Sequence, residues 1–200
     1  MSKTLYIIAG ANGSGKTTFA LNFAELDNLK FINADEIAKK YDPNDIQKYK
    51  VKAGKEFFFQ LNKSLNEEYS FIIETTMSGK YLERVIKKAK KKSFTITIIY
   101  LFLETKKENI YRVKNRVLKG GHDVPEVDII RRYYRSRKLF WDTYKDMSDK
   151  WLLFFNGDDN FEIVADKNEI FDEELMKLYL EEVNYGWIWK EDFKDSYKGC

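Results

Sequence analysis

A glycine-rich octapeptide near the amino end of the chain has the composition and spacing of a polyphosphate-binding loop. Residues 10–17 read Gly-Ala-Asn-Gly-Ser-Gly-Lys-Thr and fit the pattern G-x-x-x-x-G-K-[ST] without a mismatch. Glycines in this pattern let backbone N–H groups turn toward phosphate oxygens, and the positive end of the following helix adds to the field. The lysine reaches the β- and γ-phosphates, and the threonine hydroxyl ligates Mg²⁺. The octapeptide therefore predicts binding of ATP with Mg²⁺.

The predicted nucleotide-binding residues belong to this loop and the turn after it. They are Asn12, Gly13, Ser14, Gly15, Lys16, Thr17 and Thr18. We assign Lys16 to the phosphates as a catalytic residue and Thr17 to the metal ion. A chance glycine turn is the alternative, but ordinary composition gives such a match in roughly one chain of this length in a hundred or fewer. The octapeptide also lies between an apolar run at 5–9 and a helical pattern, which is the context that the motif requires.

Three carboxylates, Asp35, Glu74 and Glu104, directly follow predicted strands. A kinase needs a base beside the acceptor hydroxyl and a carboxylate on the metal side. Ligands of parallel α/β sheets bind at the carboxyl ends of the strands, so we expect Asp35 and Glu74 to face the same crevice as the phosphate loop. Each acid could instead cap or begin the next helix. For Glu104 we prefer that interpretation, and for Glu74 both stay open.

Arginines gather on two charged segments beyond the central predicted strand. They are Arg112, Arg116, Arg131, Arg132 and Arg135. An arginine that closes over the γ-phosphate neutralises the transferring group, and the glycine pair at 120–121 could act as the hinge of such a lid. Solvated helix faces are the alternative interpretation. The sole histidine, His122, has no metal-ligand spacing around it and is interpreted as a hydrogen-bonded loop residue.

Strand patterns alternate with helical patterns along the chain, which implies a doubly wound α/β sheet. Strands are predicted at 5–9, 31–33, 70–74, 94–103, 151–155 and 161–165, and helices near 46–66, 80–92, 106–118, 126–147 and from 170. The run at 94–103 is apolar on both faces and predicts a central strand of a parallel sheet. We predict a three-layer P-loop kinase fold with a mostly parallel sheet and a helical lid at 104–136.

Composition limits the class of protein. The 200 residues, 44% of them hydrophobic and 16% aromatic, suffice for one domain over 1–200. A net charge of +3 does not by itself favour nucleic acid or a membrane as partner. The single cysteine, Cys200, forms no internal disulfide, and no segment is long enough for a membrane span or a signal-peptide core. We therefore expect a cytoplasmic protein. The role of the tail at 185–200 stays open between packing on the body and a partner surface.

Four segments together resemble the zeta-toxin family of P-loop kinases. They are YIIAGANGSGKTTFA (6–20), FINADEIA (31–38), IIETTMSG (72–79) and RVKNRVLKGGHDVPEVDIIRRYYRS (112–136). The segments follow one another in the family's order. The resemblance implies a kinase that uses ATP or GTP to phosphorylate a sugar hydroxyl of UDP-N-acetylglucosamine. It also implies a toxin–antitoxin pair, in which a small antitoxin protein holds the kinase in check.

The resemblance further implies roles for particular residues. Asp35 matches the family's base, Glu74 and Thr76 match its Glu-x-Thr substrate motif, and two arginines match its lid. The predicted catalytic residues are thus Lys16, Asp35, Arg116 and Arg132. The predicted substrate-binding residues are Asn33, Asp35, Glu74 and Thr76.

Several functions are compatible with these motifs. The leading hypothesis is an ATP-dependent kinase acting on a hydroxyl of a sugar nucleotide. A small-metabolite or nucleotide kinase would share the loop, the base and the lid, and a regulatory P-loop ATPase would transfer phosphate to water. The chain lacks the N-K-x-D motif of guanine-reading switches. A scaffold role leaves the phosphate loop unexplained, and nucleic acid is disfavoured because the lysines at 87–92 lack interleaved aromatics.

Overall fold

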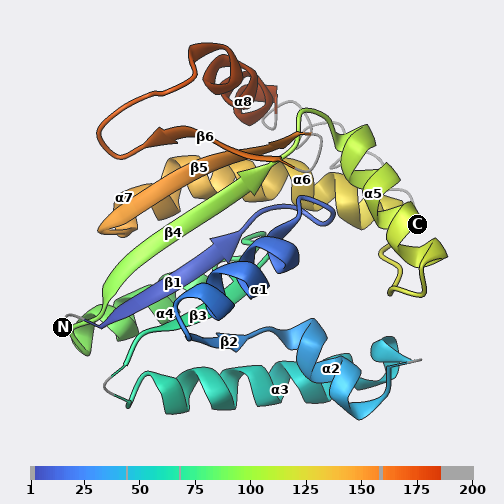
Figure 1. The fold of residues 1–200 in the computed structure, drawn as a ribbon, viewed down its shortest axis with the longest axis vertical. Coiled ribbons are helices and arrows are strands. Elements are labelled where there is room, and N and C mark those ends of the chain that lie inside the picture. The colour runs from blue at the N-terminus through green and yellow to red at the C-terminus, as the bar shows by residue number, and fades with distance from the viewer. Residues whose placement is uncertain (1–2, 44, 68, 158–159, 186–200) are drawn as a thin grey trace, which may run out of the picture.

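Six strands form a single sheet in the computed structural model, which describes residues 3–43, 45–67, 69–157 and 160–185 (Figure 1). The strands are β1 Thr4–Ala9, β2 Lys30–Ile32, β3 Phe71–Thr75, β4 Thr95–Phe102, β5 Lys150–Gly157 and β6 Asn160–Asp166. Their order is β2-β3-β1-β4-β5-β6, with β6 antiparallel to β5 and the other pairs parallel. The predicted α/β fold with a mostly parallel sheet is confirmed.

Helices connect these strands. They are α1 Lys16–Leu26, α2 Ala34–Tyr41, α3 Ile46–Ser64, α4 Tyr81–Lys91, α5 Lys106–Leu118, α6 Glu126–Leu139, α7 Lys145–Met147 and α8 Glu173–Tyr185. The helix predicted over 126–147 is divided by a π-helical segment, η1 Phe140–Tyr144. Helix α2 was not predicted. None of the helices within the described ranges is both long and apolar enough for a membrane span.

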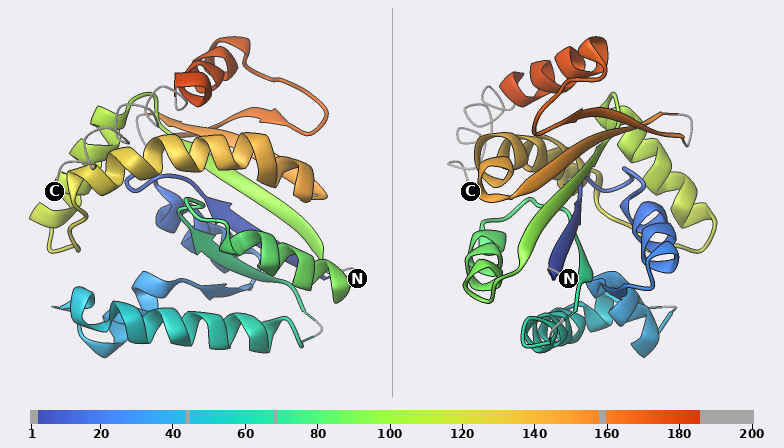
Figure 2. Two further views of the ribbon diagram at one scale, coloured as in Figure 1. Left: turned by 180° about the vertical axis from the view of Figure 1, so that it is seen from behind. Right: turned by 60° about the vertical axis from the view of Figure 1, so that its left-hand side comes forward.

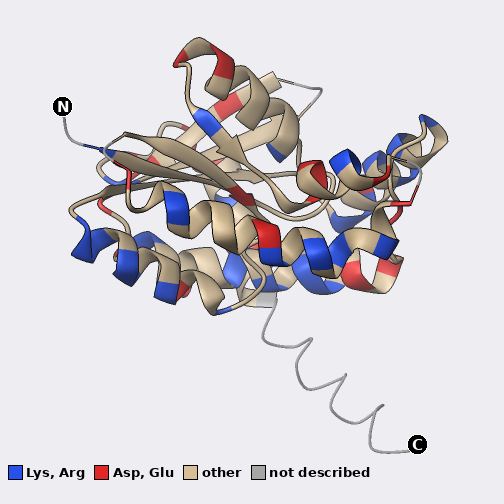
Figure 3. Ribbon diagram, turned by 90° about the horizontal axis from the view of Figure 1, so that it is seen from below, with Lys and Arg blue, Asp and Glu red and all other residues tan. Residues whose placement is uncertain are grey.

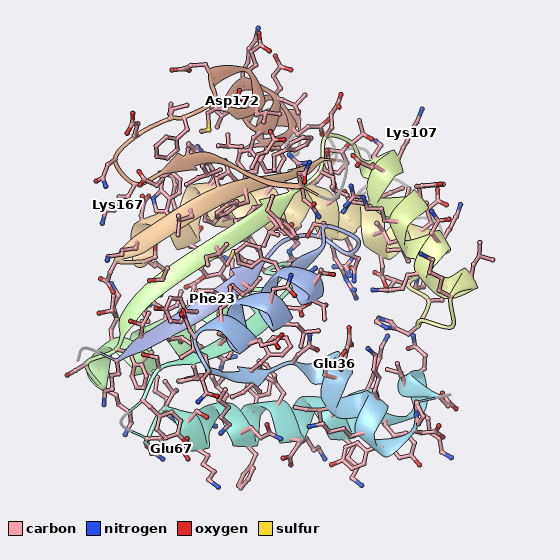
Figure 4. The ribbon with its side chains drawn as sticks, in the orientation of Figure 1. Phe23, Glu36, Glu67, Lys107, Lys167 and Asp172 are labelled. Atoms are coloured by element: carbon pink, nitrogen blue, oxygen red, sulfur yellow. The ribbon has the colours of Figure 1, made fainter. Side chains whose placement is uncertain are left out.

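The sheet separates two apolar layers because successive side chains of a strand point to opposite faces. Leu5 and Ile7 of β1 face the larger core, which includes buried residues of α3, α4, η1 and α8 and against which Leu139 of α6 packs. Ile8 of β1 faces a smaller core built with α1. Figure 2 shows α4 and α6 on the side of the sheet opposite α1. Phe23 of α1, labelled in Figure 4, packs edge-on against Tyr6 with ring centroids 5.0 Å apart.

Strand register brings three loops to one edge of the sheet. Ala9 of β1 pairs with Thr75 of β3, and Ile32 of β2 pairs with Ile73 of β3. The segments that follow β1, β2 and β3 therefore leave the sheet side by side. These are the phosphate loop, the start of α2 and the segment between β3 and α4. The predicted central strand β4 is buried along nearly its whole length, as expected. The aromatic residues of the tail lie outside the described residues.

Candidate functional site

All three glycines of the phosphate loop adopt backbone angles that other residues rarely adopt, and the φ angle of Gly10 is +146°. Gly13 and Gly15 both have φ +85°. A Cβ atom at Gly13 would lie 2.6 Å from the carbonyl oxygen of Asn109, and one at Gly15 would lie 2.2 Å from Nδ2 of Asn156. Both positions therefore need glycine for two reasons, the left-handed backbone and the close approach of a neighbour.

Two buried asparagines hold the outer side of this loop. Nδ2 of Asn109, on α5, donates to the Asn12 carbonyl at 2.6 Å, and Nδ2 of Asn156, on β5, donates to the Ser14 carbonyl at 3.1 Å. Because these carbonyls are engaged from outside, the loop conformation that turns backbone N–H groups inward is stabilised. Sequence reasoning missed both asparagines. Asn156 follows an apolar strand, the same signal that singled out Asp35, whereas Asn109 had no signal.

Lys16 is buried within the loop, and its Nζ donates to the Ala11 carbonyl at 2.7 Å. Burial lowers the pKa of Lys16, while the nearby charges of Glu74 and Asp35 act in the opposite direction. Its ammonium group is thus held at the loop, with two carboxylates close enough to favour its charged form.

Glu74 lies against the threonine that was predicted to bind the metal. The Thr17 hydroxyl lies 3.0 and 3.2 Å from the two carboxylate oxygens of Glu74, and Nδ2 of Asn33 also donates to this carboxylate. Burial raises the pKa of Glu74, and the charge of Lys16 and these hydrogen bonds oppose the shift. Carboxylate and hydroxyl oxygens are the hard donors that Mg²⁺ prefers, so Thr17 and Glu74 form a pair that fits this ion.

Asn33 fixes the start of α2 and thereby the position of Asp35. Its Oδ1 accepts hydrogen bonds from the backbone N–H of Asp35 at 2.6 Å and of Glu36 at 3.1 Å. The helix-capping role considered for Asp35 is thus filled by Asn33. The Asp35 carboxylate instead lies 3.3 Å from Nε2 of His122.

His122, interpreted from the sequence as a hydrogen-bonded loop residue, lies beside the predicted base. Its side chain is 9% exposed, against 44% for Asp35. Burial lowers the pKa of His122, while Asp35 raises it and Arg116 lowers it further. A neutral imidazole beside a partly exposed carboxylate is therefore the favoured state near neutral pH. The sequence around His122, which directly precedes Asp-Val-Pro, did not predict its contact with Asp35.

The two predicted lid arginines have different positions. Nη1 of Arg132 donates to Oδ1 of Asn12 at 3.0 Å, which places Arg132 directly on the phosphate loop. Nη2 of Arg116 donates to the His122 carbonyl at 2.9 Å, so Arg116 contacts the backbone of the histidine and not the phosphate loop. The glycine pair ends α5. Gly120 has φ +83°, and the N–H of Gly121 donates to the Arg116 carbonyl, which is a helix-terminating geometry.

A cavity of about 750 Å³ lies beside the phosphate loop. The predicted residues that line it are Asn12, Asn33, Asp35, Glu74, Thr76 and Arg132. Lining residues that were not predicted as site residues include Lys50, Gly54, Phe58, Arg84, His122 and Arg131. Arg116 is not part of the cavity wall, and Thr18 is exposed on α1. The cavity is thus lined by residues of the phosphate loop, the start of α2, β3, α3, α4 and the lid.

Sequence comparison relates this chain to known proteins at the level of a family. The AAA domain family matches residues 5–134, about two thirds of the chain. An uncharacterized protein of Haemophilus influenzae is 29% identical over 135 residues, which are 67% of this chain and 94% of that protein. The family match at 5–134 spans the phosphate loop, β2, β3, β4 and most of the lid at 104–136.

Structural comparison supports the same fold. The AvrRxo1-ORF1:AvrRxo1-ORF2 complex contains a chain with a TM-score of 0.70 and 14% identity, covering 91% of this chain but only 64% of that one. The PezAT toxin–antitoxin system of Streptococcus pneumoniae gives 0.60 and 15% identity over 94% and 88% of the two chains. A putative kinase from Chloroflexus aurantiacus gives 0.54 and 18% identity over 68% and 80%. These values show a P-loop kinase-like fold.

Proposed function

This chain belongs to the AAA domain family, and on that premise we propose that it is a phosphotransferase. It moves the γ-phosphate of ATP or GTP to a hydroxyl of a sugar nucleotide, as the UDP-N-acetylglucosamine kinases of the zeta-toxin family do. The supporting observation is the cavity of about 750 Å³ beside the phosphate loop, with Asp35 in its wall. A nucleotide switch that transfers phosphate to water does not need a cavity of this size for an acceptor beside its phosphate loop. We treat residues 1–200 as one domain with a lid over 104–136.

The phosphate loop holds the nucleotide in this proposal. Backbone N–H groups of residues 12–18 and the Lys16 ammonium bind the β- and γ-phosphates. Thr17 and Glu74 would hold Mg²⁺, which supplies charge neutralisation on the phosphate oxygens when bound. The resemblance assigns Glu74 to the substrate, whereas its hydrogen bond with Thr17 supports the metal side.

Phosphate transfer requires a base at the acceptor and positive charge at the transferring group. Asp35 takes the proton of the acceptor hydroxyl, and that oxygen bonds to the γ-phosphorus. The bond from this phosphorus to the β–γ bridging oxygen breaks, and the nucleoside diphosphate leaves. Lys16 and Arg132 neutralise the charge on the transferring oxygens, and Arg116 takes part after lid movement. Asn33 and Thr76 contact the acceptor.

The partners follow from the same resemblance. A small antitoxin protein that covers the site and a cytoplasmic site of action belong to the proposal. A neutral small metabolite is a second acceptor class. It is less well supported, because the cavity wall contains Lys50, Arg84, Arg131 and Arg132 against the two acids Asp35 and Glu74.

Mass spectrometry after incubation with MgATP and UDP-N-acetylglucosamine, alone and within a metabolite extract, tests the proposal. We expect a product that is heavier by one phosphate. Lys16→Ala should abolish transfer and weaken ATP binding strongly, whereas Asp35→Ala should abolish transfer alone. Asp146→Ala, at an exposed acid, is the control and should change neither. Equal loss of ATP affinity in the Lys16 and Asp35 variants would remove Asp35 from the acceptor role. ATP hydrolysis stimulated by a partner protein and by no metabolite would favour a regulatory ATPase.

A further inference from the structure

A glycine in the middle of α3 lines the cavity, although neither its backbone conformation nor a close neighbour requires glycine at this position. Gly54 lies well inside the helix Ile46–Ser64, where glycine is markedly less favourable than alanine. A Cβ atom at Gly54 would meet nothing within 4 Å, and the backbone there is not left-handed. The fold therefore leaves helix backbone bare at a position that lines the cavity.

The residues one turn to either side of Gly54 line the same cavity. Lys50 and Phe58 are each four residues away, and such positions lie on one face of a helix. Phe58 also packs edge to face on Tyr81 of α4, with ring centroids 5.7 Å apart and an interplanar angle of 87°. Bare backbone and this aromatic pair form a platform on which a ring or sugar can lie.

A second, smaller cavity of about 180 Å³ continues from this platform. It shares Phe58, Tyr81 and Arg84 with the first cavity. Its other lining residues are Leu61, Asn62, Leu65, Val85 and Lys88. All of these lie on or directly after α3 and on α4, and Leu61 is about 10 Å further along α3 than Gly54 at 1.5 Å per residue. Because α3 leads toward the start of β3, the groove leads away from the phosphate loop.

An uncompensated cation lies where the two cavities meet. Arg84 is exposed and makes no hydrogen bond or ion pair with any other described residue, whereas the neighbouring Lys88 donates to Asn62 at 2.6 Å. Arg84 lines both cavities, whereas Asp35 and Glu74 line only the larger one, so Arg84 lies at the end of the larger cavity that the smaller one shares. Lys and Arg residues are frequent along the helices in Figure 3. The planar guanidinium of arginine suits two oxygens of a phosphate or carboxylate.

We propose that the acceptor lies along α3 at Gly54, crosses the Phe58–Tyr81 pair and places an anionic group on Arg84. The phosphorylated hydroxyl and the anion are then at opposite ends of an elongated molecule. This inference rests on the proposed function, since it names the acceptor class of the same site. Phosphate, diphosphate and carboxylate share the required chemistry.

Calorimetry with the phosphate loop already filled tests this subsite. The protein is saturated with Mg²⁺ and the non-hydrolysable analogue AMPPNP and titrated with UDP-N-acetylglucosamine, UDP, inorganic pyrophosphate or neutral N-acetylglucosamine. Arg84→Gln should weaken the three anions about tenfold or more and leave the neutral sugar unchanged. Lys87→Gln, at an exposed lysine of α4 that lines neither cavity, is the matched control and should behave as the unchanged protein. Gly54→Leu should weaken both UDP-N-acetylglucosamine and N-acetylglucosamine while the affinity for AMPPNP stays the same.

The outcomes separate the subsite from the kinase proposal. Absence of anion binding to the loaded protein, or equal anion affinities with and without Arg84, overturns the subsite. Anion binding that depends on Arg84, without phosphate transfer to any acceptor, keeps the subsite and rejects the kinase. Transfer that proceeds equally in Arg84→Gln keeps the kinase and rejects the subsite. Unchanged AMPPNP affinity, and a melting temperature no lower than that of the unchanged protein, show that each variant is folded.

Discussion

Replacing Asn156 by alanine isolates the contribution of a distant side chain to the shape of the phosphate loop. Asn156 is 2% exposed and lies at the end of β5, where its Nδ2 donates to the Ser14 carbonyl at 3.1 Å. The alanine variant removes this donor and leaves the carbonyl without a hydrogen-bond donor among the described residues. The loop can then turn that carbonyl inward, where phosphate oxygens would repel it.

The size of the effect follows from the cost of an unsatisfied buried carbonyl. That cost is about 1–3 kcal/mol. If only the present loop conformation binds nucleotide, the same free energy is lost from ATP binding, which corresponds to a decrease in affinity of roughly 5- to 150-fold. The loss in the free energy of unfolding has the same upper limit, because the hydrogen bond is also broken on unfolding.

Calorimetric titration with MgATP and urea denaturation measure the two quantities separately. Asn66→Ala, at an exposed asparagine of the segment after α3, serves as the control and should change neither. A variant at Asn156 that loses stability but binds ATP within twofold of the unchanged protein would refute the reasoning. It would show that Asn156 supports the fold and not the loop conformation.

Three further predictions concern the cavity wall. Gly54→Ala should raise the free energy of unfolding by about 0.5–1 kcal/mol in urea denaturation, because alanine is the better helix residue and meets no neighbour; no gain would mean that this backbone is constrained in another way. Since burial lowers the pKa of His122, the unfolded chain binds more protons, and stability should fall as the pH drops below about 6.5. His122→Gln should flatten the melting temperature between about pH 5 and 7, and an equal slope in both proteins would contradict this assignment. Glu74→Gln should raise the Mg²⁺ concentration needed for half-maximal ATP turnover, measured by Mg²⁺ titration, and an unchanged requirement would return Glu74 to the substrate side.

The sequence alone determined features that depend on neighbours in the chain. The phosphate loop is one contiguous octapeptide, and its glycines are required by local backbone angles. The motif can therefore be recognised from the sequence without knowledge of the tertiary structure. Alternating apolar patterns predicted the sheet and its helices, because burial on a strand or helix repeats with a fixed period. Helix α2 was not predicted, although the sequence carries a signal for its start. Asn33 is followed three residues later by Glu36, which is a capping-box pattern.

Only the tertiary structure decided which distant side chains complete the site. The asparagines that hold the phosphate loop come from positions 97 and 142 residues away from the carbonyls they bind. His122 meets Asp35, and Arg84 joins Phe58, because the lid and the α3–α4 pair approach the carboxyl edge of the sheet. No periodic pattern within the sequence predicts these contacts between distant residues. They depend on strand order and helix packing, which bring together segments whose local patterns carry no information about one another.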